Sequence, residues 1–137
     1  MDLMATPVSA QRLPGKTGVL PFYSRFRTAG CQGVDVLSQD LSTLGDSGNP
    51  CFGYCFPPTT MIGVVLQRLA ECRAQAVVIV PDVRKLWYPL LDGATVRSMT
   101  VARQGEASVF YRMDHTRGKV SFRFSRWAMR AIHVKFD

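Results

Sequence analysis

The chain has 137 residues, 47% of them hydrophobic, and a formal net charge of +7. This length predicts one domain with a substantial core, and the charge favours polyanionic partners. The sequence has neither an apolar run long enough to span a membrane nor a secretory signal at its start, so we expect an intracellular protein, nuclear or cytoplasmic.

Prolines and glycines are frequent in residues 1–30, which predicts an extended arm that wraps a single α/β domain formed by residues 31–137. The arm contains the letters Gly-Lys-Thr at residues 15–17, as in a phosphate-binding loop. The earlier glycine, the preceding buried strand and the following helix of such a loop are missing, so we expect a turn here.

Three aromatic residues of the arm, Phe22, Tyr23 and Phe26, alternate with Arg25 and Arg27. Such a pattern can stack on the bases of a single-stranded nucleic acid. Aromatic side chains that anchor the arm to the body of the protein are the favoured interpretation.

Residues 33–37 are expected to form a short strand that carries Asp35, with Asp40 shortly after it and a loop over residues 42–50. Two carboxylates near a strand end can hold a metal ion or a ribose. Aspartate is also common as a turn or cap residue, and both interpretations stay open.

The stretch from Cys51 to Pro89 predicts a strand, a helix and a second strand. Residues 52–56 are aromatic and uncharged, which favours a strand buried on both faces. Pro57 and Pro58 end this strand because proline has no N–H to donate and fixes its own φ.

A helix is expected to follow, capped by Thr59 or Thr60, because apolar residues between 61 and 69 recur at helical spacing. Residues 76–80 then predict a second buried strand, which Pro81 closes. The connection between the two strands should be right-handed.

Strand patterns dominate the rest of the chain. After a short apolar and aromatic segment at residues 83–91, alternating side chains predict strands over 95–102, 107–113 and 120–124, the last two joined by a hairpin connection at 114–119. Residues 127–134 suit a helix or a strand, and the alternation of Ile132, Val134 and Phe136 favours a strand.

The residues from 112 onward are strongly basic, with aromatic residues interleaved. Such a strand pair is a candidate surface for single-stranded nucleic acid, because rings stack on bases and cations neutralise phosphates. An amphipathic edge, with aromatic residues inward and arginines outward for solubility, explains the same alternation, and both interpretations stay open. The candidate nucleic-acid-binding residues are Arg112, Arg117, Lys119, Arg123, Arg126, Trp127 and Arg130.

The four cysteines are Cys31, Cys51, Cys55 and Cys72. They contain no Cys-x-x-Cys pair, and both histidines lie far from them in sequence. We therefore expect reduced, buried thiols rather than a zinc site.

Several of these segments, in this order, resemble one segment of the polyproteins of DIRS-type, tyrosine-recombinase retrotransposons, downstream of the reverse transcriptase and ribonuclease H. The Phe-Pro-Pro element and the Trp-Tyr-Pro-Leu-Leu element are the specific part, and residues 92–137 have no counterpart. The resemblance is carried by Asp2–Thr6, Gly33–Asp35, Tyr54–Pro58, Ile62–Leu69, Val77–Pro81 and Trp87–Leu91.

The same layout is similar to phage-type Dam adenine-N6 methyltransferases, which run from a Thr-Pro through a glycine-and-acid strand end to an Asn-Pro-Pro-Tyr strand end. Thr6-Pro7, Gly33–Asp35 and Phe56–Thr59 occupy those places. The resemblance implies a Rossmann-like, methyltransferase-type α/β sheet, partly parallel, with antiparallel C-terminal strands and a cofactor at the carboxyl ends of the strands. The degenerate cofactor-binding positions that it implies are Asp35, Phe56, Pro57 and Pro58.

One departure from that motif bears on activity. In the family, the first motif residue accepts a hydrogen bond from the target amine, and the residue after Pro-Pro stacks on the flipped base. This chain has Phe56 and Thr59 there, and a phenyl ring cannot accept that hydrogen bond. Losing one such contact costs about 3 kcal/mol. The glycine-rich cofactor loop is also thin, so we expect no catalytic residue and no cofactor, with S-adenosylmethionine as the disfavoured alternative.

The sequence thus predicts a non-catalytic, methyltransferase-like module of retroelement origin. It would bind nucleic acid or a protein partner through its basic C-terminal surface. Three alternatives stay open: an active S-adenosylmethionine-dependent DNA methyltransferase, a metal-dependent nuclease that uses Asp2, Asp35 and Asp40, and a structural subunit of a larger assembly.

Overall fold

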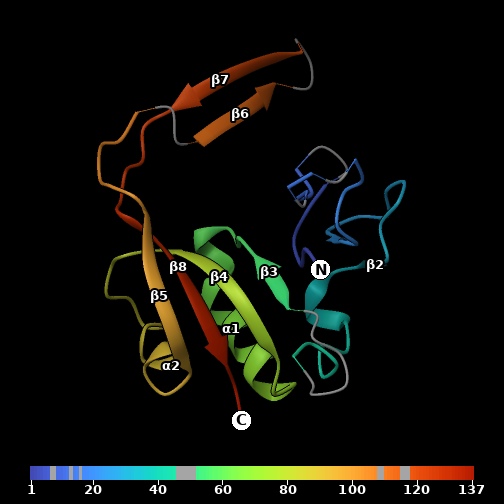
Figure 1. The fold of residues 1–137 in the computed structure, drawn as a ribbon, viewed down its shortest axis with the longest axis vertical. Helices are drawn as coiled ribbons and strands as arrows, with labels where there is room; N and C mark the ends of the chain where they lie inside the picture. Colours follow the sequence, from blue (N-terminus) through green and yellow to red (C-terminus); the bar gives the residue numbers. More distant parts are fainter. Residues whose placement is uncertain (7–8, 13, 16, 46–51, 108–109, 115–117) are drawn as a thin grey trace.

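The computed structural model describes residues 1–6, 9–12, 14–15, 17–45, 52–107, 110–114 and 118–137. Its centre is a four-stranded sheet in the order β3-β4-β8-β5 (Figure 1). The strands β3 (Gly53–Cys55) and β4 (Gln75–Pro81) are parallel, whereas β8 (Met129–Lys135) is antiparallel to both β4 and β5 (Thr95–Ala102). The structure therefore confirms the predicted mixed α/β class and the antiparallel strands near the C-terminus.

The predicted strand, helix and strand of the central stretch are confirmed. Helix α1 (Ile62–Glu71) connects β3 to β4, and it buries Ile62, Val65, Leu66 and Leu69 at helical spacing. The predicted threonine cap is wrong, because a 3-10 turn (η2, Thr59–Met61) precedes α1 and no side chain caps either helix. Pro58 starts that turn, so both threonines already lie inside it.

One face of the four-stranded sheet packs against α1 and forms the main core. Ala76, Val78 and Val80 of β4, with Ile132 and Val134 of β8, are each at most 3% exposed and belong to the same cluster as the buried residues of α1. The 3-10 turn η1 (Val36–Ser38) and the short helix α2 (Pro89–Asp92) add Val36 and Leu91 to this cluster.

The opposite face of the sheet carries no helix in the described part of the chain (Figure 1). This corrects the expectation that residues 52–56 are buried on both faces. Gly53 and Cys55 face the core and are buried, but Phe52 and Phe56 are 45% and 41% exposed.

A second, two-stranded sheet joins the first through the start of the chain. The parallel strands β1 (Tyr23–Ser24) and β2 (Gly33–Val34) form it, and Asp2 makes parallel bridges to both Phe22 and Tyr54. The N–H of Asp2 donates to the Pro21 carbonyl at 2.8 Å, and the N–H of Leu3 donates to the Tyr54 carbonyl at 2.7 Å. Strand pairing therefore continues from β2 through β1, Asp2, β3, β4 and β8 to β5.

The short strand expected at residues 33–37 ends earlier than predicted. Its pairing stops at Val34 because Asp35 has a φ of 58° and caps η1 instead. The loop expected at 42–50 lies partly outside the described residues. The division of the chain near residue 30 stays a prediction.

The remaining predicted strands are present, but β5 does not alternate between buried and exposed residues: only Ser98 and Ala102 are not exposed. β6 (Phe110–Asp114) and β7 (Lys119–Arg123) pair in antiparallel register, and β8 confirms the strand alternative for the last segment. In the described residues, no helix has the length and apolar character needed to cross a membrane.

We predict that Gly53→Ala destabilises the fold. A Cβ at this position would lie 2.8 Å from Leu3 Cδ1 and 3.2 Å from Ala76 Cβ, inside the seam between the chain start and β4. Overpacking of this kind costs about 1–3 kcal/mol, measurable by urea denaturation.

Gly93→Ala is the matched control, because no atom lies within 4 Å of a Cβ built there. We expect it to change the free energy of unfolding by less than about 0.5 kcal/mol. Equal stability of the two variants would contradict the close contact at Gly53.

Candidate nucleic-acid interface

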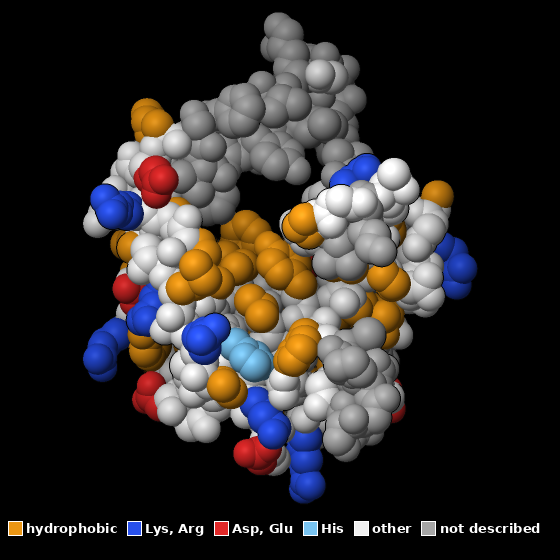
Figure 2. Space-filling model, viewed as in Figure 1, with side chains coloured by type: hydrophobic (Ala, Val, Ile, Leu, Met, Phe, Trp, Pro, Cys, Tyr) orange, Lys and Arg blue, Asp and Glu red, His pale blue; other side chains and the backbone are white. Residues whose placement is uncertain are grey.

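A cleft of about 320 Å³ lies at the carboxyl ends of β3 and β4. Figure 2 looks onto the sheet face opposite α1 and shows hydrophobic side chains gathered in a hollow at this edge. The residues that line the cleft are Phe56, Pro57, Thr59, Pro81, Arg123, Phe124, Arg126, Trp127 and Met129.

The antiparallel register of β8 brings two distant segments together in this cleft. Pro81, the last residue of β4, pairs with Met129, the first residue of β8. The basic segment that precedes β8 therefore returns to the carboxyl end of β4, beside the Phe56-Pro57 end of β3.

Apolar side chains form most of the cleft wall, and their exposure rises toward the outside. Met129 is only 6% exposed, whereas Trp127 is 37% and Phe124 is 72% exposed. A concave apolar surface with a few polar groups at its margin is typical of ligand sites. Exposed rings in such a site are available to stack on a planar ligand.

Two arginines supply the charge of the cleft. The guanidinium carbon of Arg126 lies 5.2 Å from the centre of the Trp127 ring, a cation–π distance, and Arg123 lines the same wall. Between them, the fully buried Ser125 donates its N–H to the Glu106 carbonyl at 2.9 Å and its hydroxyl to the Trp127 carbonyl. These bonds hold the segment in place, so the arginines extend from an ordered backbone.

The structure brings only some of the predicted nucleic-acid residues together. Arg123, Arg126 and Trp127 share the cleft. Arg130 lies on β8, where its guanidinium is 3.9 Å from the Asp82 carboxylate and donates to the Ser98 hydroxyl. Arg112 belongs to β6 and Lys119 to β7, and Arg117 lies outside the described residues.

The predicted cofactor positions are also divided. Phe56 and Pro57 line the cleft, and Pro58 starts η2. Asp35 does not line it: at the end of β2, its carboxylate accepts hydrogen bonds from the Leu37 N–H at 3.1 Å and the Ser38 hydroxyl at 3.3 Å.

The residues that follow Asp2, which bridges β1 and β3, do not fit S-adenosylmethionine. A cofactor of this kind needs a glycine-rich turn and a helix N-terminus directly after the central strand. Met4, Ala5 and Thr6 stand there, and no helix lies among the described residues before Phe22. The Asp2 carboxylate is engaged with this segment, because it accepts the N–H of Met4 at 3.2 Å and that of Gln11 at 3.1 Å.

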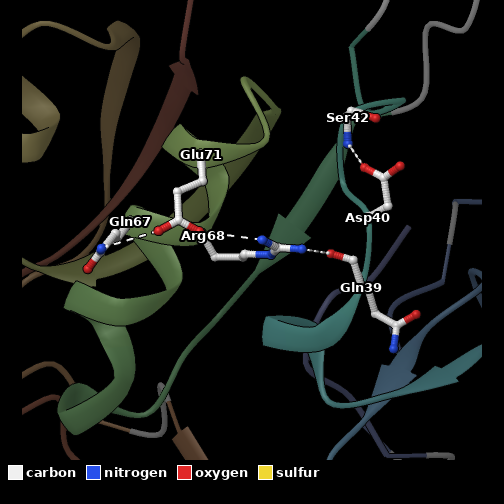
Figure 3. Close-up of polar contacts among 6 residues, drawn as sticks. All are labelled: Gln39, Asp40, Ser42, Gln67, Arg68 and Glu71. Carbon is white, nitrogen blue, oxygen red and sulfur yellow. Dashed lines mark hydrogen bonds and ion pairs between the residues drawn. The ribbon is translucent and has the colours of Figure 1, made fainter.

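The three carboxylates of the nuclease alternative do not form a metal site. Asp2 and Asp35 bind nearby amides, and Asp40 accepts the Ser42 N–H at 2.9 Å (Figure 3), which lowers the pKa of Asp40. Within the described ranges, no group of three or more acidic, histidine or cysteine side chains is placed to hold a metal ion. The turn and cap interpretation of Asp35 and Asp40 is the one that the structure bears out.

Figure 3 also shows what fixes the segment that carries Asp40. Arg68 of α1 donates to the Gln39 carbonyl at 2.7 Å and lies 3.4 Å from the Glu71 carboxylate. The arginine thereby ties the loop after η1 to the outer side of α1, away from the cleft.

The cysteines are free thiols at the three described positions. Cys55 is fully buried in the core, and this burial raises its pKa to about 12. Such a thiol stays protonated and unreactive near neutral pH. Cys31 and Cys72 are only half-buried, which corrects the expectation that they are buried. Cys51 lies outside the described residues.

Sequence reasoning missed that the Phe-Pro-Pro element and the basic C-terminal segment share one site. It also missed Met129 as the base of the cleft. A signal was present, since an antiparallel last strand that pairs with residues 76–80 must begin where those residues end.

No protein-family model, no curated protein and no solved structure matches this chain. The two family resemblances therefore stay predictions from the sequence.

We predict that Asp2 makes stability depend on pH. Burial raises the pKa of Asp2 above its ordinary value of 3.8, against the opposing effect of the Met4 and Gln11 N–H groups. The folded chain therefore binds the proton more tightly than the unfolded chain, so this contribution to stability is full below pH 3.8 and is lost as pH rises through the folded-state pKa.

Asp2→Asn, which cannot titrate, isolates this effect. The free energy of unfolding of the original chain minus that of Asp2→Asn should fall as pH rises from about 4 to 7, by about 1.4 kcal/mol for each pKa unit of the shift. A difference that is independent of pH, or that rises with pH, would contradict the cost of burying the carboxylate.

Proposed function

We propose that this chain is a non-catalytic, methyltransferase-like module of retroelement origin that binds nucleic acid at the carboxyl ends of β3 and β4. The observation that carries the proposal is the shared cleft, in which Phe56 and Pro57 lie with Arg123, Arg126 and Trp127. Cations for phosphates and exposed rings for bases are the two components of a surface for nucleic acid.

The strand order supports a Rossmann-like sheet. If the Asp2 segment counts as the first strand, then β1, β2, β3 and β4 are the second to fifth, and the order across the sheet is 3-2-1-4-5. The Rossmann order is 3-2-1-4-5-6, with ligands at the carboxyl ends near the switch between strands 1 and 4. In this chain β5 is the sixth strand in sequence order. The antiparallel strand β8 lies between it and β4, the fifth strand.

The chemistry of the cleft supports binding without methyl transfer. Phe56 stands where the resemblance requires a side chain that accepts a hydrogen bond from the target amine, and Thr59 stands where it requires an aromatic ring. Without an acceptor beside the amine, the developing positive charge would meet an apolar ring. The retroelement origin rests on the sequence resemblance.

We predict that Arg123→Gln with Arg126→Gln weakens binding of single-stranded DNA or RNA at least tenfold and makes it less sensitive to salt. A plot of the logarithm of the binding constant against the logarithm of the salt concentration has a negative slope. Each lost phosphate contact should make this slope less steep by about 0.7, so the double variant should make it less steep by about 1.4. Fluorescence anisotropy over a salt series measures both quantities.

Arg97→Gln with Lys135→Gln is the charge-matched control. Both side chains are exposed, and Arg97 pairs with His133 near the opposite end of the sheet. The control should keep most of the affinity. Equal losses of affinity in the two double variants would mean that binding depends on the net charge of the protein and not on the cleft. The absence of salt-dependent binding would overturn the proposal.

We also predict that calorimetric titration with S-adenosylmethionine gives no heat of binding. The reason is the absence of a glycine turn and a helix N-terminus after the Asp2 segment in the described residues. Micromolar binding would restore the active methyltransferase as the better interpretation.

A second candidate function is a role as a structural subunit with a protein partner. The uncovered sheet face favours it, because Phe52 and Met99 are 45% and 61% exposed there and exposed apolar patches commonly mark protein interaction sites. A chain that binds no nucleic acid at any salt concentration would point to this function.

A further inference from the structure

We propose that the bound nucleic acid is single-stranded and that Phe26 is a second stacking platform for it, apart from the cleft. This inference rests on the proposed function and names its ligand more narrowly. It starts from the aromatic residues of the first thirty residues, which the structure divides into two groups. Phe22 is buried at 2% exposure and anchors a small cluster with Ala5 and Ala10, whereas Phe26 is 68% exposed.

The position of Phe26 follows from the strand pairing. It lies two residues beyond Ser24, the last residue of β1. Because β1, the Asp2 segment and β3 all run in the same direction, the carboxyl end of β1 lies at the same edge of the sheet as the cleft. One chain of nucleotides that follows this edge would reach both places.

The local chemistry of Phe26 repeats that of Trp127. The guanidinium carbon of Arg25 lies 5.3 Å from the centre of the Phe26 ring, and that of Arg126 lies 5.2 Å from the centre of the Trp127 ring. In both pairs a ring is presented beside a cation, the combination that binds a base and its phosphate. A third pair lies in the segment between β4 and α2, where the guanidinium carbon of Arg84 is 5.8 Å from the centre of the Tyr88 ring.

Charge complementarity favours a polyanion along the whole edge. The acidic side chains near it are already engaged: Asp35 caps η1, Asp82 pairs with Arg130, and the Glu106 carboxylate accepts the Arg103 N–H at 2.8 Å. Basic residues that follow the strands or line the cleft include Arg25 and Arg27 after β1, Arg84 and Lys85 after β4, Arg103 after β5, and Arg123 and Arg126 in the cleft.

The exposed rings favour a single strand over a duplex. Phe26 and Phe124 are 68% and 72% exposed, and a ring can stack only on a base whose face is free. In a duplex the neighbouring base pairs cover those faces. An unpaired strand also has the flexible backbone needed to bend from the cleft to Phe26.

The test compares oligothymidylates of about 4 and about 16 nucleotides, the range of site sizes for single-strand-binding domains. We expect Phe26→Ala to weaken binding of the longer oligomer about fivefold or more while leaving binding of the shorter one, held in the cleft, unchanged. Phe52→Ala is the matched control, because Phe52 is an exposed phenylalanine at the opposite end of β3. Equal thermal midpoints would establish that each variant is folded.

The outcomes separate this inference from the proposed function. If Arg123→Gln with Arg126→Gln weakens both oligomers but Phe26→Ala weakens neither, the second platform is wrong and the cleft stands. If a duplex of the same length competes as well as the single strand, the assignment of a single-stranded ligand is overturned. If the original chain binds no oligomer, both proposals fall. Parallel titrations with oligouridylates of the same lengths would show whether the protein binds RNA or DNA more tightly.

Discussion

The parallel pairing of Asp2 and Leu3 between Phe22 and Tyr54 is the interaction on which the rest of the structure depends. Neither β1 nor β2 is longer than two residues, so they gain stability only by continuing a larger sheet. The Asp2 and Leu3 hydrogen bonds provide that continuity, and the absence of a side chain at Gly53 leaves room for Leu3. The same pairing sets the direction of β1 and therefore the edge at which Phe26 lies.

The central strands and helix could be predicted because their residues carry local periodic signals. Val77 to Val80 are β-branched and uncharged, and α1 repeats its buried residues at helical spacing. The strand at Asp2 could not be predicted in this way. It is very short, it contains an aspartate, and its partners lie about twenty and fifty residues further along the chain.

The segments that form the candidate site could be recognised in the sequence, but their proximity in the fold could not be predicted from it. Phe56-Pro57 and the Arg123–Trp127 segment each have a recognisable composition, whereas their proximity depends on the register of Pro81 with Met129. Likewise, residue type alone could not separate Phe22 from Phe26, because both are phenylalanines and tertiary packing buries only Phe22. Where one face of the sheet is uncovered, an uncharged aromatic run no longer indicates burial.

The edge strand β5 affects how copies of this protein behave when concentrated. Val96, Met99 and Val101 are 46–61% exposed on a strand that ends the four-stranded sheet. Its pairing with β8 is irregular between Thr95 and Arg97 and again between Thr100 and Ala102. Such irregularities bend and twist an edge, so that another chain finds no flat row of amides to extend. We therefore expect these two irregularities to hinder the edge-to-edge pairing of copies along this apolar margin.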